Sequence, residues 1–296
     1  MLDVTGMEDG LTKVLRLWNE SAPYWEKHSR AIQAMFKPIS RAMIADARIS
    51  TRDIVLDVAG GTGDPTLDIA RACGPGGWVA GSDAIWGMVA AARRRANRDH
   101  LRNTHFVQCR ADALPFRAET FDAAMCRLGV MFFLNPEHDV RQMLSTLKPG
   151  GRLTFAVWGS SEFNPFFSIL PPILQRYVPI PPAAPDAPGA FRFAEPGKLA
   201  GLLEAAGASQ VHERAIDFAI EADVSLEDFW TLRSEMSDTL RERAKQLSPA
   251  QLASVKRDVQ VDCKPYFAAA RMSFPARCLI VGAAKPPAGY SLRSQR

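Results

Sequence analysis

Short apolar runs separated by amphipathic segments dominate the first half of the chain. Apolar residues at helical spacing over 11–25 and 31–47 predict two helices, which precede a β-branched apolar run at 54–58. Further strands are predicted at 78–83, 121–127 and 153–158, and residues 106–116 are predicted to be a strand that leads into an acidic loop. A helix is predicted at about 136–147. Continuous apolar strands bounded by glycines are typical of a parallel sheet, so we predict an α/β fold.

The second half continues this alternation with one long interruption. Its predicted elements are a helix at 199–206, a strand at 211–220, helices at 226–246 and 249–267, and a strand at 276–283. Ser248 followed by Pro249 is a typical helix start. The helical insertion is long for a hairpin, so we expect it to fold back over the site together with the N-terminal helices and the loop at 163–188.

The most informative segment is the turn after the first strand, where residues 57–65 read DVAGGTGDP. Gly60, Gly61 and Gly63 can adopt backbone angles closed to other residues, and without a Cβ they let a ligand approach main-chain N–H groups. Asp64 and Pro65 predict a capped helix start. The same glycines also fit a merely tight strand-to-helix turn.

A carboxylate at the end of the next strand narrows the interpretation. Asp83 follows the glycines by about 20 residues, the spacing at which a carboxylate accepts both hydroxyls of a ribose. Taken alone, Asp83 also fits a cap for a helix that starts near Trp86. The glycine turn and Asp83 together indicate a cofactor that contains a ribose.

Several ordered blocks carry a family resemblance over residues 50–160. After the glycine turn and Asp83 come Asp-Ala-Leu-Pro-Phe at 112–116 and Leu-Lys-Pro-Gly-Gly-Arg-Leu at 147–153. This order resembles class I S-adenosylmethionine-dependent methyltransferases, and most closely the quinone-biosynthesis C-methyltransferases and related small-molecule enzymes. The resemblance implies a doubly wound, mostly parallel, seven-stranded Rossmann-like sheet with a helical cap, and S-adenosyl-L-methionine as cofactor.

The resemblance also implies roles for individual residues. Asp83 would hold the ribose, and Asp112 would accept from the adenine amino group. The other cofactor-binding residues that it implies are Tyr24, Ala59, Gly60, Gly61, Gly63, Ala84, Met88, Ala113 and Arg127. Met88 and Trp86 fit core packing equally well. Arg127, at the end of a strand, is expected either to face the ligands or to reach the surface.

On this basis the chain is expected to have five parts: a helical cap (1–50), an S-adenosylmethionine-binding core (51–160), a proline-rich substrate loop (161–194), the rest of the sheet with a helical lid at about 225–270 (195–285), and a flexible tail (286–296). Proline clusters at 171–172 and 179–188 motivate the loop, because proline cannot continue a helix or donate to a central strand.

The expected reaction is in-line methyl transfer to a small, apolar or aromatic metabolite in a lidded pocket. Aromatic residues that can build the pocket are Phe132, Phe133, Trp158, Phe163, Phe166, Phe167, Phe229, Trp230, Tyr266 and Phe267. Each also fits an ordinary core position. His28 is the first candidate for a general base and His138 the second, because histidine titrates near neutral pH. Transfer by positioning alone needs no base.

Composition limits the alternatives. The five cysteines, Cys73, Cys109, Cys126, Cys263 and Cys278, are scattered without close pairs, which favours reduced thiols and argues against a metal site. No secretion signal or membrane-length run is evident, so a cytoplasmic location is expected. The oligomeric state stays open, a homodimer included.

Two other function classes stay open. The net charge is +4, and five arginines cluster on one predicted helix and the turn after it: Arg93, Arg94, Arg95, Arg98 and Arg102. They motivate an RNA or protein methyltransferase, but a solvated helix face is the favoured interpretation of these arginines. Arg127-Leu128-Gly129-Val130 stands where amino-directed nucleic-acid enzymes of this fold carry Asn-Pro-Pro-aromatic, so no nucleic acid is expected. The third class is a non-catalytic cofactor-binding protein.

Overall fold

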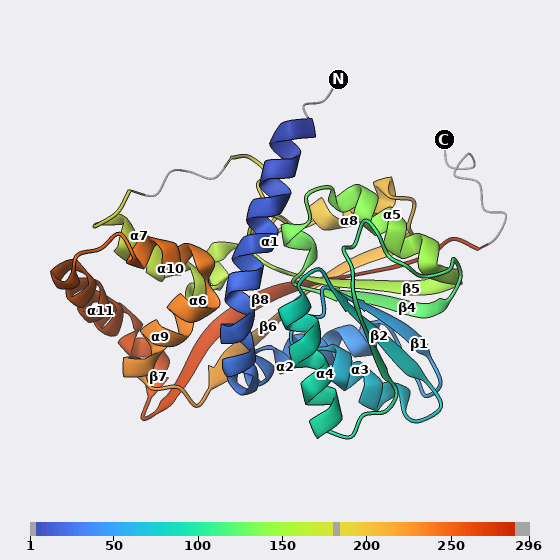
Figure 1. Ribbon diagram of the computed structural model, residues 1–296, viewed down its shortest axis with the longest axis horizontal. Helices are drawn as coiled ribbons and strands as arrows, with labels where there is room; N and C mark the ends of the chain where they lie inside the picture. Colours follow the sequence, from blue (N-terminus) through green and yellow to red (C-terminus); the bar gives the residue numbers. More distant parts are fainter. Residues whose placement is uncertain (1–3, 180–183, 288–296) are drawn as a thin grey trace.

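The computed structural model describes residues 4–179 and 184–287 (Figure 1), so the predicted tail at 286–296 lies outside the described residues from 288 onward. A mixed sheet with strand order β3-β2-β1-β4-β5-β8-β6 runs through the molecule. Its strands are β1 (Ile54–Val58), β2 (Trp78–Asp83), β3 (Thr104–Gln108), β4 (Phe121–Arg127), β5 (Leu147–Trp158), β6 (Ser209–Ala222) and β8 (Arg271–Ala284). A two-residue strand, β7 (Phe267–Ala268), pairs with β8.

The first five strands are parallel, and β8 joins antiparallel to both β5 and β6. The predicted α/β, mostly parallel, seven-stranded sheet is therefore confirmed, with β7 as a short addition. After β3 the chain returns to β4 on the other side of β1. This reversal of direction leaves a crevice at the carboxyl ends of β1 and β4, the place where such sheets bind ligands.

Helices cover both faces of the sheet (Figure 1). On one face lie α2 (Ser29–Asp46), α3 (Thr66–Cys73) and α4 (Trp86–Arg98), and on the other lie α5 (Pro136–Thr146) and α8 (Lys198–Ala205). The apolar spacing of α2 explains its position: Ile32, Met35, Phe36, Ile39 and Met43 share one stripe and are all buried.

The remaining helices form a separate group beside the sheet. They are α1 (Val4–Lys27), α6 (Pro165–Ser168), α7 (Leu170–Gln175), α9 (Leu226–Met236), α10 (Asp238–Ala244) and α11 (Pro249–Cys263), with the 3₁₀ turns η2 (Ser161–Phe163) and η3 (Lys264–Tyr266). A further 3₁₀ turn, η1 (Val130–Phe132), follows β4 and contacts β5. The long helix α1 packs on α4 at one side and on α9 and α10 at the other, so it bridges this group and the sheet layer.

Two predicted helices and one predicted loop differ from the structure, each for an identifiable reason. The predicted helix at 226–246 breaks at Ser237, which is extended (φ −116°, ψ 115°) and whose side chain caps α10. The helix that begins with the Ser248 capping box ends at Cys263, because Pro265 has no N–H to continue it. The prolines at 171–172 lie in the first turn of α7, where the missing N–H costs nothing, and not in a loop.

A buried carboxyl group joins β1 to α3. Asp57 is fully buried and its Oδ2 accepts a hydrogen bond from Thr66 Oγ1 (2.5 Å), while Oδ1 has no partner among the described residues. A Cβ on Gly60 would lie 2.8 Å from both Asp57 Oδ2 and Thr66 Oγ1. Gly60 therefore lets the turn pack over this pair. Burial raises the pKa of Asp57 to about 7.

This raised pKa predicts a pH-dependent stability. Because the folded state binds a proton on Asp57 more tightly than the unfolded chain, its contribution is complete below about pH 4 and is lost as the pH rises to about 7. The slope is at most about 1.4 kcal/mol per pH unit. We expect Asp57→Asn to flatten the fall in unfolding free energy between pH 5 and 7, measured by urea denaturation. Glu221→Gln, at an exposed carboxylate, should leave the slope as in the wild type; an unchanged slope in Asp57→Asn would contradict the assignment.

Candidate functional site

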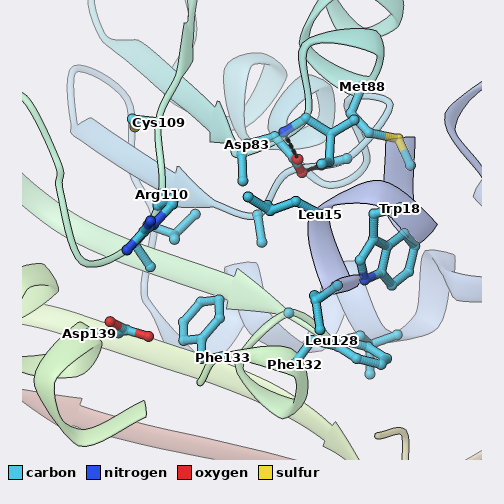
Figure 2. A pocket seen from close by; sticks show the side chains of 18 of the residues that line it. Leu15, Trp18, Asp83, Met88, Cys109, Arg110, Leu128, Phe132, Phe133 and Asp139 are labelled. Atoms are coloured by element: carbon cyan, nitrogen blue, oxygen red, sulfur yellow. Dashed lines mark hydrogen bonds between the residues drawn. The ribbon is translucent and has the colours of Figure 1, made fainter. Parts of the chain in front are cut away.

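A pocket of about 440 Å³ lies at the carboxyl ends of β1, β2 and β4 (Figure 2). Its base is formed by Val58, Asp83 and Arg127, the residues that end these strands. Loops after β3 and β4 form one wall, and α1 and α2 form another. The pocket therefore occupies the crevice that the strand order creates.

Asp83 holds the two loops at the base of this pocket together. Its Oδ2 accepts a hydrogen bond from the Gly61 N–H and its Oδ1 from the Ile85 N–H, both at 2.9 Å. It does not cap α4, whose N-cap residue Ile85 has no side-chain cap bond. Burial raises the pKa of Asp83 to about 6, against the opposing effect of these main-chain bonds.

The glycines of the turn have different surroundings. Gly61 has φ +55° and a Cβ there would meet nothing within 4 Å, so it presents bare backbone to the pocket. Gly63 has φ +103°, and its Cβ would come within 3.3 Å of Ala92 in α4, so it permits close helix packing. Ala59 and Leu128 also line the pocket and adopt left-handed angles (φ 56° and 61°), which non-glycine residues rarely do.

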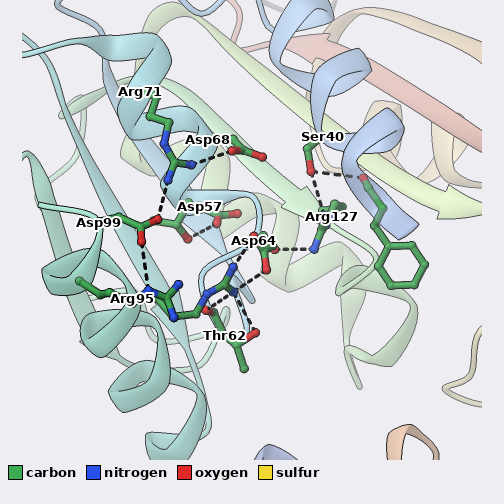
Figure 3. A network of polar contacts seen from close by, with 12 residues as sticks. Ser40, Asp57, Thr62, Asp64, Asp68, Arg71, Arg95, Asp99 and Arg127 are labelled. Carbon is green, nitrogen blue, oxygen red and sulfur yellow. Dashed lines mark hydrogen bonds and ion pairs between the residues drawn. The ribbon is translucent and has the colours of Figure 1, made fainter. Parts of the chain in front are cut away.

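A network of buried arginines supports the turn from behind (Figure 3). Arg95 binds both oxygens of Asp64 (2.5 and 3.1 Å) and the Thr62 carbonyl (2.8 Å). The predicted helix cap by Asp64 is therefore wrong, since its carboxylate turns to Arg95. Arg95 faces inward, which corrects the interpretation of all five clustered arginines as a solvated face.

Arg127 belongs to the same network and does not reach the surface. It is 8% exposed, donates to Ser40 Oγ (2.8 Å) and to the Asp64 carbonyl (2.6 Å), and lies over the Phe36 ring. Burial lowers the pKa of Arg127. Because Arg127 also lines the pocket, it presents positive charge to that cavity.

The two ends of the pocket differ in polarity. At one end Arg110 pairs with Asp112, and Cys109, His138 and Asp139 complete the lining. The other end is apolar and is lined by Leu11, Val14, Leu15, Trp18, Trp25, Ile32, Phe36 and Phe132. Trp18 makes edge contacts with Trp25 (5.6 Å) and Phe132 (5.2 Å) between ring centroids. In Figure 2, Arg110 and Asp139 lie on one side and Trp18 and Leu128 on the other.

Most of the residues implied for the cofactor come together here, and some do not. Ala59, Gly61, Asp83, Ala84, Met88, Asp112 and Arg127 line the pocket. Gly60 and Gly63 face the protein interior, and Ala113 is exposed beside Asp112. Tyr24 lies against Arg241 (5.1 Å) outside the lining, and Trp86 is 54% exposed.

His28 is also outside the lining. It sits at the junction of α1 and α2, and its Nε2 lies 2.5 Å from Glu235 Oε2 in α9. Lys27 binds the same carboxylate at 2.8 Å. His138, the second candidate base, does line the polar end.

Among the aromatic candidates, Phe132 and Phe133 line the pocket. Phe166, Phe229 and Tyr266 instead pack around Phe274 of β8. The helical insertion at 225–270 and the loop at 163–188, which were expected over the site, supply none of the described residues that line this pocket. Sequence reasoning expected the N-terminal helices over the site but did not name the residues of α1 that form this wall. The spacing of Leu11, Leu15 and Trp18 shows a helix face, but only tertiary contacts reveal what that face covers.

All five cysteines are unpaired, and no group of three potential ligands is placed to hold a metal ion among residues 4–179 and 184–287. Over the same ranges, none of the helices has the length and apolar character needed to span a bilayer.

Comparisons with known proteins extend this picture. The family described as Methyltransferase domain matches residues 55–151. A ubiquinone/menaquinone biosynthesis C-methyltransferase of Pasteurella multocida is 36% identical over 37% of this chain and 44% of its own length. The corresponding enzyme of Xanthomonas campestris pv. campestris is 30% identical over 62% of this chain and 76% of its own length. The chain thus spans less than half of the first relative and three quarters of the second.

Solved structures agree at the level of fold. The YcgJ protein from Bacillus subtilis has a TM-score of 0.54 at 18% identity, covering 83% of this chain and 97% of its own. A putative methyltransferase from Bacillus halodurans has a TM-score of 0.52 at 20% identity, covering 83% and 98%. Together with the sequence relatives, they show that this chain belongs to the class I S-adenosylmethionine-dependent methyltransferases, and that it is related to the quinone-biosynthesis C-methyltransferases.

Proposed function

We propose that this protein transfers the methyl group of S-adenosylmethionine to a small, apolar or aromatic metabolite. One observation carries the proposal: a single pocket joins a polar wall at the ends of β1 and β2 to an apolar, aromatic wall beneath α1. The polar wall suits a nucleoside and the apolar wall suits the acceptor. The relatives are named as C-methyltransferases of quinone biosynthesis, and this supports an acceptor built on an aromatic ring.

The residues around the pocket fit the cofactor. Two carboxylate oxygens offer about four lone-pair sites, so Asp83 can keep its two main-chain bonds and still accept from ribose hydroxyls. Gly61 leaves open space against its backbone. Arg127 supplies positive charge near the turn, and Met88 supplies an apolar surface for a base. Gly60 and Gly63 would act by shaping the turn.

S-adenosylmethionine, when bound, supplies a methyl group already activated by its sulfonium. The protein therefore has to orient the acceptor in line with that group and exclude water, an effect that can lower the barrier by about 7–11 kcal/mol. Trp18 and Phe132 can fix the plane of an aromatic acceptor, because they meet edge to face at the apolar end. Leu11 and Leu15 of α1 would keep water out.

The position of His28 favours a structural role over the predicted catalytic one. His28 and Lys27 tie the α1–α2 junction to Glu235 of α9, which holds α1 over the pocket. Transfer by positioning alone, with no general base, then accounts for the site. This leaves His138 as the histidine that lines the pocket.

The first prediction of the proposed function concerns the affinity for the cofactor. Asp83→Ala removes the ribose acceptor and two main-chain bonds, so we expect S-adenosylhomocysteine to bind at least tenfold more weakly in calorimetry at pH 8. Asp83→Asn retains an acceptor and should lose less. Glu221→Ala, at an exposed carboxylate of β6, should bind as the wild type does. Wild-type affinity in Asp83→Ala would refute the ribose assignment, provided the variant unfolds cooperatively.

The second prediction tests the acceptor class. Cell extract incubated with the protein and methyl-labelled cofactor should yield label in the fraction soluble in organic solvent, and none above background in RNA or protein. The physical reason is the apolar end of the pocket, which suits a small apolar acceptor better than a charged polymer. A matched reaction with Asp83→Ala gives the background. Label confined to RNA or protein would overturn the proposed substrate class.

The third prediction separates the two roles of His28. A general base contributes about 10²–10⁴ to the rate, whereas a structural tether should not. Once an acceptor is known, we expect His28→Gln and Glu235→Gln to keep kcat within about threefold and to lower the melting temperature together. A drop in kcat above a hundredfold in His28→Gln alone would restore the catalytic role.

A further inference from the structure

Asp139, in the first turn of α5, is a buried carboxyl group at the polar end of the pocket. It is 5% exposed and lines the cavity, and Figure 2 shows its carboxylate on the same side as Arg110. Its carboxylate makes no hydrogen bond or ion pair with any residue of 4–179 or 184–287. The Asp139 oxygens are not among the fully buried side-chain atoms that lack a partner, so they are accessible from the cavity. A donor on a ligand in the pocket can therefore reach this carboxylate, whose acceptor capacity the described residues leave free.

None of the charged neighbours of Asp139 among the described residues donates a hydrogen bond to its carboxylate. Asp112 lies across from it, and both Asp112 oxygens are engaged by Arg110. The other charged or titratable groups that face Asp139 are His138 and Arg192. Burial, and next the negative charge of Asp112, raise the pKa of Asp139 to about 7. A neutral N–H donor placed between the two carboxyl groups would hydrogen-bond to both of them. It would compensate for the burial of Asp139 and reduce the repulsion between Asp139 and Asp112.

The direction of the nucleoside identifies this donor. In sheets of this type a carboxylate at the end of the second strand holds the ribose, and the glycine turn takes the part of the ligand opposite the base. The base then lies beyond Asp83, away from Gly61. That end of the pocket contains Asp112 and Asp139. An exocyclic amino group has two N–H donors, one for each carboxyl group.

We propose that Asp139 is a specificity-determining residue that, together with Asp112, accepts hydrogen bonds from the exocyclic amino group of the purine base. The proposal rests on the proposed function, since it assumes that the nucleoside of the cofactor occupies this pocket. Asp139 thereby selects a 6-aminopurine over a purine with a carbonyl oxygen at the same position, because two carboxylates repel that oxygen.

The test compares S-adenosylhomocysteine with S-inosylhomocysteine, which carries a carbonyl in place of the amino group, by calorimetry at pH 8. The wild type should bind the adenosyl compound at least tenfold more tightly. Asp139→Ala should reduce this preference about fivefold or more, and Asp139→Asn should reduce it as well, because its amide can donate to the carbonyl. Glu137→Gln, an exposed carboxylate on the same helix, is the matched control and should keep the wild-type ratio.

A pH series distinguishes a direct contact from a structural role. As the pH falls from 8 to 6, Asp139 gains a proton and can donate to the carbonyl, so the wild-type preference should shrink. It should not change with pH in Asp139→Ala. Asp83 also titrates in this range, but it contacts the ribose common to both compounds, so its effect cancels in the ratio. An equal preference in the wild type and Asp139→Ala overturns this proposal alone. If the wild type binds neither compound, the proposed function fails with it.

Discussion

Asp83 accepts hydrogen bonds from the Gly61 and Ile85 N–H groups, and these two bonds join the turn after β1 to the start of α4. Because β1 and β2 are parallel and in register, both segments leave the sheet at the same edge. The carboxylate uses only part of its acceptor capacity for this purpose. One side chain therefore shapes the backbone of the pocket and still has free acceptor sites for a ligand.

The apolar half of the pocket depends on contacts between distant parts of the chain. Helix α1 covers the cavity because it is held at both sides: by α4 of the sheet layer, and by α9 through Lys27, His28 and Glu235. Trp25 adds a bond from its indole N–H to the Met236 carbonyl (3.2 Å). The position of the apolar wall thus depends on contacts of α1 with distant segments, whereas the polar wall depends on the sheet edge.

Local patterns predicted the sheet edge well. The strand at 121–127, the glycine turn and Asp83 all follow from runs of apolar residues and the backbone freedom of glycine. What failed was the direction of side chains. The Asp64 carboxylate pairs with Arg95, because a buried guanidinium requires a counter-charge. No periodicity in the sequence predicts that ion pair. Likewise Phe166 and Phe229 pack around Phe274, whereas Trp18 reaches the pocket, because the packing of the helices decides which aromatic faces meet.

We expect one ligand to span the glycine turn, the end of β2 and the polar loop after β3. Amide hydrogen exchange in the presence and absence of S-adenosylhomocysteine tests this most directly. Protection should increase together at 59–64, 83–88 and 109–113, with smaller changes in α1. A second pocket lies between α4 and β3 and is lined by residues of 93–107, Arg93 and Arg102 among them. Protection confined to that pocket, or none at the three segments despite saturating ligand, would contradict this expectation.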